Sequence, residues 1–250
     1  MKAGVIIQAR TGSTRLPNKI LLDFVNGERI IDILLQNLKK ALPDIPVIVA
    51  TTTSPNDKIF EEISQRNEVL CFRGDEQDVL DRFIKAAEYY DIDTIIRVCS
   101  DNPLLQAESI HTLINTYKNE PSDYVSFSFP DKLPVIKSHL GLYPELTSLT
   151  TLRKVQEMTK EKIYREHVTN YIYAHPERFK VTLLDLPSFL QNRKDIRFTV
   201  DTSLDFETMQ KLYTLYHGEL NGSLKNLVEW IDVHPDVYEI MSKNIKENSK

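Results

Sequence analysis

The segment that decides the fold lies at residues 4–19 and reads GVIIQARTGSTRLPNK. Its first six residues form a short apolar run rich in β-branched side chains, which is typical of a strand buried on both faces of a parallel sheet. A loop with three cationic side chains follows directly. Further runs of the same kind come at 47–52 (VIVATT), 68–72 (EVLCF) and 94–100 (TIIRVCS).

Amphipathic helical patterns separate these runs. Residues 30–42 and 78–90 carry apolar side chains three and four positions apart. Ser54, as a cap residue before a proline, predicts a further helix over 55–66. A strand, a helix and a parallel strand connect with a right-handed crossover, so the pattern predicts a doubly wound α/β sheet. In such sheets ligands bind beyond the carboxyl ends of the strands.

The pattern is looser in the second half of the chain. FKVTLLDLP at 179–187 and IRFTVD at 196–201 are predicted strands, and Thr202 predicts the cap of a helix that follows. No linker or repeat marks an independent second domain. We therefore predict a single domain over residues 1–250, with an insertion at about 126–195.

Composition argues against several classes of protein. The 250 residues include 31 lysine and arginine against 36 aspartate and glutamate, a formal net charge of −5. This balance lacks the basic excess that binding to a nucleic-acid backbone requires. No apolar run is long enough for a membrane span or a signal peptide, so we expect a cytoplasmic protein with no membrane or nucleic-acid partner. Cys71 and Cys99 lie in predicted strands, and we expect buried structural thiols there.

The loop after the first strand has the residue types of a phosphate-binding site. Gly12 and Ser13 are small, so backbone N–H groups can approach an anion, and Arg10, Arg15 and Lys19 can neutralise its charge. The segment matches neither a Walker loop nor the glycine fingerprint of dinucleotide-binding proteins. The alternative is an ordinary solvated basic turn.

Two aspartates follow predicted strands in corresponding positions. Asp101 comes after the run at 94–100, and Asp201 ends the run at 196–201. Carboxylates at the ends of two strands of one sheet can share a Mg²⁺ ion, a hard cation that binds one or two carboxylates together with phosphate oxygens. The alternative is that each is a helix cap or a turn residue.

Other polar residues have simpler interpretations. Asp78 and Arg82 lie four positions apart in a predicted helix, which favours an ordinary surface ion pair over the alternative of a contact with ribose. No dedicated side-chain base is evident. His139 and His167 could serve as one, although a lone histidine is more often a binding or structural group.

Together these segments resemble the cytidylyltransferase family that includes CMP-KDO synthetase and CMP-acylneuraminate synthetase, and in particular its spore-coat polysaccharide biosynthesis protein F branch. The resemblance covers nearly the whole chain. Its motifs are ARTGSTRLPNK (9–19), FRGDEQDVLDRF (72–83), RVCSDNPLL (97–105), YREHVTNYIYAHPERFK (164–180) and RFTVDTSLDFE (197–207). SHLGLYPE at 138–145 resembles a segment of the acceptor pocket in CMP-KDO synthetases. Cys99 and Ser100 stand where the branch often has threonine and glycine.

The resemblance implies a fold and a reaction. The fold would be a Rossmann-like three-layer sandwich with a mostly parallel mixed sheet, of the nucleotide-diphospho-sugar transferase type. The reaction would be Mg²⁺-dependent transfer of CMP from CTP to a sugar acid, of the 2-keto-3-deoxy type or a related glycan precursor, with release of diphosphate. The insertion at about 126–195 would serve acceptor binding and the formation of a homodimer.

The resemblance also implies a role for individual residues. Arg15, Lys19 and Asp101 would be catalytic, and Asp101 and Asp201 would hold the metal. The nucleotide would be bound by Ala9, Arg10, Gly12, Ser13, Ala50, Thr51, Arg73 and Gly74. The sugar acid would be bound by Lys137, His139, Arg165, Glu166 and His167.

Two other functions remain open. A GT-A type glycosyltransferase that uses a nucleotide-sugar donor would normally need an acidic pair, one residue apart, after a central strand. Here Asp101 is followed by asparagine and proline, and the only pair of aspartates with this spacing, Asp91 and Asp93, precedes its strand. A non-catalytic nucleotide-binding protein would be expected to have lost a cation or a carboxylate of the site, yet all of them are present.

Overall fold

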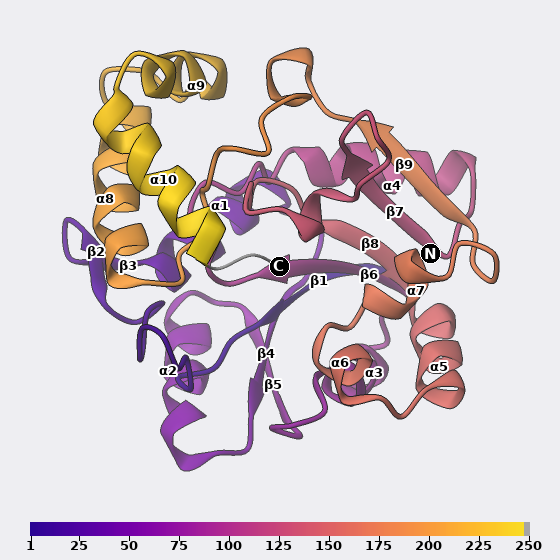
Figure 1. Ribbon diagram of the computed structural model, residues 1–250. Coiled ribbons are helices and arrows are strands. Elements are labelled where there is room, and N and C mark those ends of the chain that lie inside the picture. The colour runs from indigo at the N-terminus through magenta and orange to yellow at the C-terminus, as the bar shows by residue number, and fades with distance from the viewer. Residues whose placement is uncertain (248–250) are drawn as a thin grey trace.

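A seven-stranded sheet forms the centre of the protein (Figure 1). The computed structural model describes residues 1–247. The strand order is β5-β4-β1-β6-β8-β7-β9. The parallel strands predicted in the first half are β1 (Ala3–Gln8), β4 (Val47–Thr52), β5 (Leu70–Gly74) and β6 (Thr94–Cys99). β8 (Glu145–Ser148) runs antiparallel to both of its neighbours, and β9 (Val181–Asp185) is parallel to β7 (Tyr124–Ser128). The predicted mostly parallel mixed sheet is confirmed.

Helices cover both faces of this sheet. Because alternate side chains of a strand point to opposite faces, Val5 and Ile7 belong to one buried cluster and Ile6 to the other. The first cluster includes side chains of α1 (Ile30–Ala41), α2 (Ile59–Arg66), α4 (Ser109–Asn119), α8 (Ser203–His217), α9 (Leu224–Asp232) and α10 (Pro235–Glu247). The second includes side chains of α3 (Val79–Tyr89), α5 (Leu149–Met158) and α7 (Asn170–Ala174), and α6 (Lys162–Glu166) packs on α3. The predicted three-layer sandwich results.

Short elements complete the chain. β2 (Asp23–Val25) and β3 (Glu28–Arg29) form a hairpin beside the main sheet, and three short 3₁₀ helices are η1 (Pro55–Lys58), η2 (Val135–Lys137) and η3 (Ser188–Leu190). The segment at 126–195 contributes β8, β9 and most of β7 to the same sheet as the first half. In the described part of the chain, no helix combines the length and the apolar character that crossing a membrane requires.

The strand predicted at 196–201 is wrong. Residues 196–200 are buried but belong to no strand. Their backbone instead makes single hydrogen bonds to two loops: Phe198 N donates to His139 O (2.9 Å) and Val200 N donates to Asp101 O (3.1 Å). The strand-like pattern therefore reflects burial of an extended segment, which still brings the two predicted metal-binding carboxylates together.

Smaller predictions have mixed outcomes. The helix predicted over 55–66 is divided into η1 and α2, and the side chain of Ser54 makes no capping hydrogen bond. Both cysteines are only half-buried, so the expectation of buried thiols is wrong. The cap predicted at Thr202 is confirmed, since Thr202 and Asp205 form a reciprocal capping box at the start of α8.

Candidate active site

A cleft of about 320 Å³ lies at the carboxyl ends of β1 and β6. This is the edge at which open α/β sheets bind ligands. The cations of the loop after β1 and both predicted metal-binding aspartates line it, together with residues of α3 and α6. The lining residues include Gln8, Ala9, Arg10, Gly12, Ser13, Arg15, Lys19, Val79, Arg82, Cys99, Ser100, Asp101, Glu166, His167 and Asp201.

The loop after β1 is held by one buried carboxylate. Asp57 Oδ1 accepts hydrogen bonds from the backbone N–H and the hydroxyl of Thr11, both at 2.7 Å, and Oδ2 accepts one from the hydroxyl of Thr52. A Cβ at Gly12 would meet no atom within 4 Å, so the backbone there is open to the cleft. The loop is therefore fixed at Thr11 while an anion can approach its small residues. The sequence carried no signal for this role of Asp57.

Lys19 joins the two aspartates at the end of the cleft. Its Nζ lies 2.7 Å from Asp101 Oδ2, 3.0 Å from Asp201 Oδ1 and 2.6 Å from the carbonyl oxygen of Val200. Arg15 Nη2 lies 2.8 Å from the same Asp201 oxygen. Two cations and two carboxylates thus meet at one point, although they come from three separate parts of the sequence. The convergence of Asp101 and Asp201 that the sequence predicted is present.

The cluster keeps these groups ionised. Burial would raise the pKa of Asp201, but the charge and hydrogen bond of Lys19, with the charges of Arg15 and Arg197, lower this pKa to about 2. Burial would likewise lower the pKa of Lys19, but Asp101 and Asp201 raise this pKa above its ordinary value. Lys19 and Asp201 therefore both carry charge at neutral pH.

We expect the stabilisation that Asp201 contributes to disappear at low pH. Because the pKa of Asp201 is depressed in the folded protein, its ion pairs stabilise the fold fully above the pKa of an unfolded aspartate, about 4. Their contribution is lost as the pH falls towards 2. The difference in melting temperature between the wild type and Asp201→Asn should shrink as the pH falls from about 5 towards 2. Asp44→Asn, at an exposed position, serves as the control. If the difference in melting temperature between the wild type and Asp201→Asn did not change with pH, the ion pairing would be contradicted.

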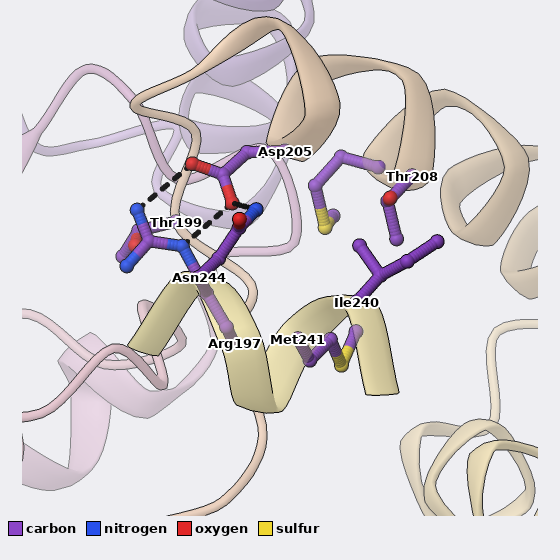
Figure 2. A pocket seen from close by; sticks show the side chains of 8 residues that line it. Arg197, Thr199, Asp205, Thr208, Ile240, Met241 and Asn244 are labelled. Atoms are coloured by element: carbon purple, nitrogen blue, oxygen red, sulfur yellow. Dashed lines mark hydrogen bonds and ion pairs between the residues drawn. The ribbon is translucent and has the colours of Figure 1, made fainter. Parts of the chain in front are cut away.

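A buried network behind Asp201 holds its carboxylate in place. Arg197 Nη2 donates to Asp201 Oδ2 (2.8 Å), and Arg197 Nε donates to Asp205 Oδ1 (2.7 Å). Asn244 of α10 donates to the same Asp205 oxygen (2.7 Å), so the last helix braces this network. Figure 2 shows Arg197, Asp205 and Asn244 meeting beside a small pocket under α10. The orientation of Asp201 is therefore set by residues far from the cleft opening.

The two aspartates fit a hard divalent cation. Asp101 Oδ2 and Asp201 Oδ1 converge on one ammonium group at 3.0 Å or less, so two anionic oxygens already point to a common centre. No cluster of three or more histidine, cysteine, aspartate or glutamate side chains with metal-binding geometry occurs among residues 1–247. Two carboxylates with the other positions left for phosphate and water oxygens are the donor set that Mg²⁺ favours.

Of the residues expected at the sugar acid, two lie in the cleft. Glu166 and His167 line it, and Glu166 Oε1 is 3.8 Å from Arg10 Nη2. Arg165 is not among the lining residues, and its guanidinium pairs with Asp78 at 2.8 Å. The C-terminal end of α6 thus faces the loop after β1 across the cleft.

The other two residues expected at the sugar acid lie outside the cleft lining. Lys137 is exposed at the end of η2. His139 is buried, and its Nδ1 contacts Arg197 Nη1. Because a guanidinium can only donate, Nδ1 must be the acceptor, and the ring proton of the neutral tautomer lies on Nε2. His139 Nδ1 is therefore engaged with Arg197 and is not a free base.

The residues expected around the cytidine also lie outside the lining of the cleft. Ala50 and Thr51 are fully buried in β4. Arg73 donates from Nε to the carbonyl oxygen of Thr52 and from Nη2 to that of Ser54. Its guanidinium therefore fixes the loop after β4. The role of these residues at the base stays a prediction, and the structure places none of them in the lining of the cleft.

Arg82 lines the cleft, although the sequence favoured a surface ion pair for it. The predicted surface pair with Asp78 is wrong, because Arg82 is 1% exposed and its Nη1 donates to the carbonyl oxygen of Asp75 at 2.6 Å. Burial and the nearby charge of Arg10 lower the pKa of Arg82 to about 10. A Cβ at Gly74 would lie 3.0 Å from Arg82 Cγ, so the glycine leaves room for this side chain. The available signal was its place on the apolar face of the helix.

Known proteins similar to this chain share its whole length. A protein of Methanocaldococcus jannaschii described as uncharacterized protein MJ1063 is 40% identical, over 100% of this chain and 98% of its own. Spore coat polysaccharide biosynthesis protein SpsF of Bacillus subtilis is 31% identical (92% and 94%). The 3-deoxy-manno-octulosonate cytidylyltransferase of Francisella tularensis subsp. novicida is 25% identical (94% and 96%).

A solved structure and a family model also match this chain. The structure of a cytidylyltransferase from Leptospira borgpetersenii superposes with a TM-score of 0.81 at 29% identity, covering 95% of this chain and 97% of that one. The family model described as cytidylyltransferase matches residues 4–229, a range that includes the loop after β1 and both aspartates of the cleft. This chain therefore belongs to the cytidylyltransferase family.

Proposed function

We propose that the protein transfers CMP from CTP to a sugar acid, of the 2-keto-3-deoxy type or a related glycan precursor, and releases diphosphate. The observation that carries this proposal is the meeting of Lys19 and Arg15 with Asp101 and Asp201 in the cleft. Relatives named for spore-coat polysaccharide biosynthesis and for 3-deoxy-manno-octulosonate cytidylyl transfer support a role in surface polysaccharide synthesis.

The residues of the cleft suit phosphoryl transfer. An acceptor oxygen would attack the α-phosphorus of CTP in line, and the bond to the β-phosphate oxygen would break with release of diphosphate. Arg15 and Lys19 now contact the aspartates. In the complex they would contact the phosphate oxygens instead, including those of the leaving diphosphate. Arg10 and Ser13, on the same loop, would orient the triphosphate.

We propose Mg²⁺ as the cofactor, held by Asp101 and Asp201. When bound, Mg²⁺ would polarise phosphate oxygens and offset the charge that develops during transfer. Asp201 is prepared for this role because Arg197 fixes its second oxygen at 2.8 Å. The Lys19 ammonium would move from between the carboxylates to the phosphates.

The test is a diphosphate-release assay with CTP, Mg²⁺ and a panel of 2-keto-3-deoxy sugar acids and sugar phosphates. Release of diphosphate with formation of a CMP-sugar is expected for at least one sugar acid. Release of a nucleoside diphosphate from a nucleotide-sugar would instead support a glycosyltransferase, and binding of CTP without turnover of any panel member would support a non-catalytic protein. The acidic pair that a glycosyltransferase would use lies at the opposite end of β6, where Asp91 contacts Lys2 and Asp93 contacts the amino terminus.

We expect CTP to stabilise the protein more than other nucleotides do. A pocket built largely from backbone at strand ends can match the donor and acceptor edge of cytosine and exclude purines by size. With Mg²⁺ present and CTP at about 100 times its Kd, the melting temperature should rise by roughly 5–10 °C. UTP is the matched control, because it carries the same triphosphate on a ring of the same size. Equal shifts with CTP, UTP, ATP and GTP would contradict the prediction.

We also propose a homodimer in which the segment at 126–195 takes part. Two large apolar side chains of this segment are exposed: Met158 at the end of α5 (46%) and Ile163 in α6 (53%). Light scattering on the purified protein is expected to give twice the chain mass, and Ile163→Glu is expected to lower it. A measured mass equal to that of a single chain in the wild type would contradict the proposal.

A further inference from the structure

The orientation of one cleft side chain is determined by a buried arginine. Gln8 is the last residue of β1 and lines the cleft. Arg97 of β6 lies beside it, and Arg97 Nη2 is 3.1 Å from Gln8 Oε1. A guanidinium has only hydrogen-bond donors, so the atom that faces it must be the carboxamide oxygen. The Nε2 group of Gln8 is therefore turned away from Arg97.

Arg97 is itself held by a buried network. Its Nη1 pairs with Glu145 Oε2 across the β6 and β8 strands. The other oxygen of Glu145 accepts hydrogen bonds from the hydroxyls of Tyr124 (2.5 Å) and Thr169 (2.9 Å). All four of these side chains are buried. A buried ion pair with its remaining acceptors satisfied has little freedom to move, so Arg97 is a rigid positioning residue for Gln8.

The consequence is a fixed hydrogen-bond donor that faces the cleft. Gln8 Nε2 has no hydrogen-bond partner within residues 1–247, and Gln8 is half-buried. Water can satisfy this donor while the cleft is empty. A ligand that displaces the water must supply an acceptor, because a desolvated donor without a partner is unfavourable.

We infer that Gln8 is a specificity-determining residue, which donates from Nε2 to an acceptor atom of a bound substrate. The inference rests on the proposed function. The shared chemistry is an oxygen or ring-nitrogen acceptor without a hydrogen, which either the cytosine ring or the acceptor sugar can present. A site that hydrogen-bonds its substrate discriminates strongly against analogues that lack the matching group.

Two variants of Gln8 separate the donor from the contact with Arg97. Gln8→Glu keeps an oxygen opposite Arg97 and replaces the donor by a second oxygen. Gln8→Met has nearly the same length and removes both groups. We expect each variant to keep the melting temperature within a few degrees of the wild type. We expect the KM of one substrate, CTP or the sugar acid, to rise by about 3-fold to 100-fold, where the upper range applies to a carboxylate partner.

Two controls exclude trivial causes. Gln65→Glu adds the same charge at an exposed position of α2 and should change neither KM. Tripolyphosphate is a probe that has the phosphates but neither the base nor the sugar. We expect it to compete with CTP and to keep the same inhibition constant in Gln8→Met. In Gln8→Glu, any increase in the inhibition constant of tripolyphosphate measures the repulsion between the new carboxylate and the phosphates alone. The fold-change in KM for CTP is divided by the fold-change in this inhibition constant.

The outcomes distinguish the inference from the function on which it rests. A larger KM for CTP in both variants assigns the donor to the cytosine ring, and a larger KM for the sugar acid assigns it to the acceptor. Unchanged KM values in both variants of an active enzyme would overturn the inference alone. Equal losses for tripolyphosphate and for the substrates would also overturn it, because the effect would then be general. Absence of turnover in the wild type would instead refute the proposed function.

Discussion

Asp101→Asn is expected to lower kcat by on the order of 100-fold or more while the protein still folds. Asparagine keeps the shape of aspartate but removes the charge that Lys19 contacts and that a metal ion would need. Asp201→Asn should lose as much activity. It should also lose some stability, because its new NH₂ group would face the donors of Lys19, Arg15 or Arg197. The measurement is diphosphate release, with thermal unfolding as the check on folding.

The double variant tests whether the two aspartates act through one centre. Its loss of transition-state free energy should be smaller than the sum of the two single losses. Lys19 contacts both carboxylates, so this coupling by itself does not require a metal. The Mg²⁺ dependence decides that point. In each single variant the Mg²⁺ concentration for half-maximal rate should rise, and an unchanged concentration would mean that the aspartates act through Lys19 alone.

Lys19→Met is expected to have the second large effect. Methionine fills much of the same volume without the ammonium, so we expect a loss of about 100-fold or more in kcat. The two aspartates would then face each other with only Arg15 and Arg197 to balance them. The melting temperature without metal should therefore fall, although by less than the loss of the sole partner of a buried charge would cause, because both arginines still contact Asp201. Mg²⁺ should restore more stability to this variant than it adds to the wild type, because Lys19 no longer competes for the carboxylates.

Lys39→Met is the matched control, because Lys39 also pairs with a carboxylate, Glu68, but on the surface. It should leave kcat unchanged and lower the melting temperature only slightly. If Lys19→Met were fully active, the cluster would be structural and the assignment of the phosphate-binding loop would fail. If its melting temperature were insensitive to Mg²⁺, the aspartates would not be the metal ligands.

The sequence contained enough information for the sheet and for the loop chemistry. Buried parallel strands and amphipathic helices leave local patterns, since burial on two faces selects continuous apolar runs and burial on one face selects a helical period. The runs at 4–9, 47–52 and 94–100 therefore predicted β1, β4 and β6 correctly. The cations after β1 and the position of Asp101 after β6 indicated a site at this edge of the sheet, because the end of a buried strand can be located from its apolar run.

The same local patterns gave wrong predictions for residues whose surroundings come from distant parts of the chain. Residues 196–200 have the apolar pattern of a strand because they are buried, but Phe198 and Val200 donate their backbone hydrogen bonds to two loops and not to a strand. Arg82 has the spacing of a surface ion pair with Asp78, yet the packing of α3 against β5 buries it. Periodicity reports that a side chain is buried or exposed and carries no information about which segment buries it.

Only the tertiary structure decided how the polar groups of the site are paired. Asp57 reaches Thr11, Arg197 reaches Asp201 and His139, and Arg97 orients Gln8. Except for Arg197 and Asp201, these partners are far apart in the sequence. An ion pair or hydrogen bond depends on distances of about 3 Å and on the direction of donor and acceptor atoms. Such distances are set when the strands and helices pack, so residue types and spacing determined which chemistry was available, and packing determined which atoms carry it.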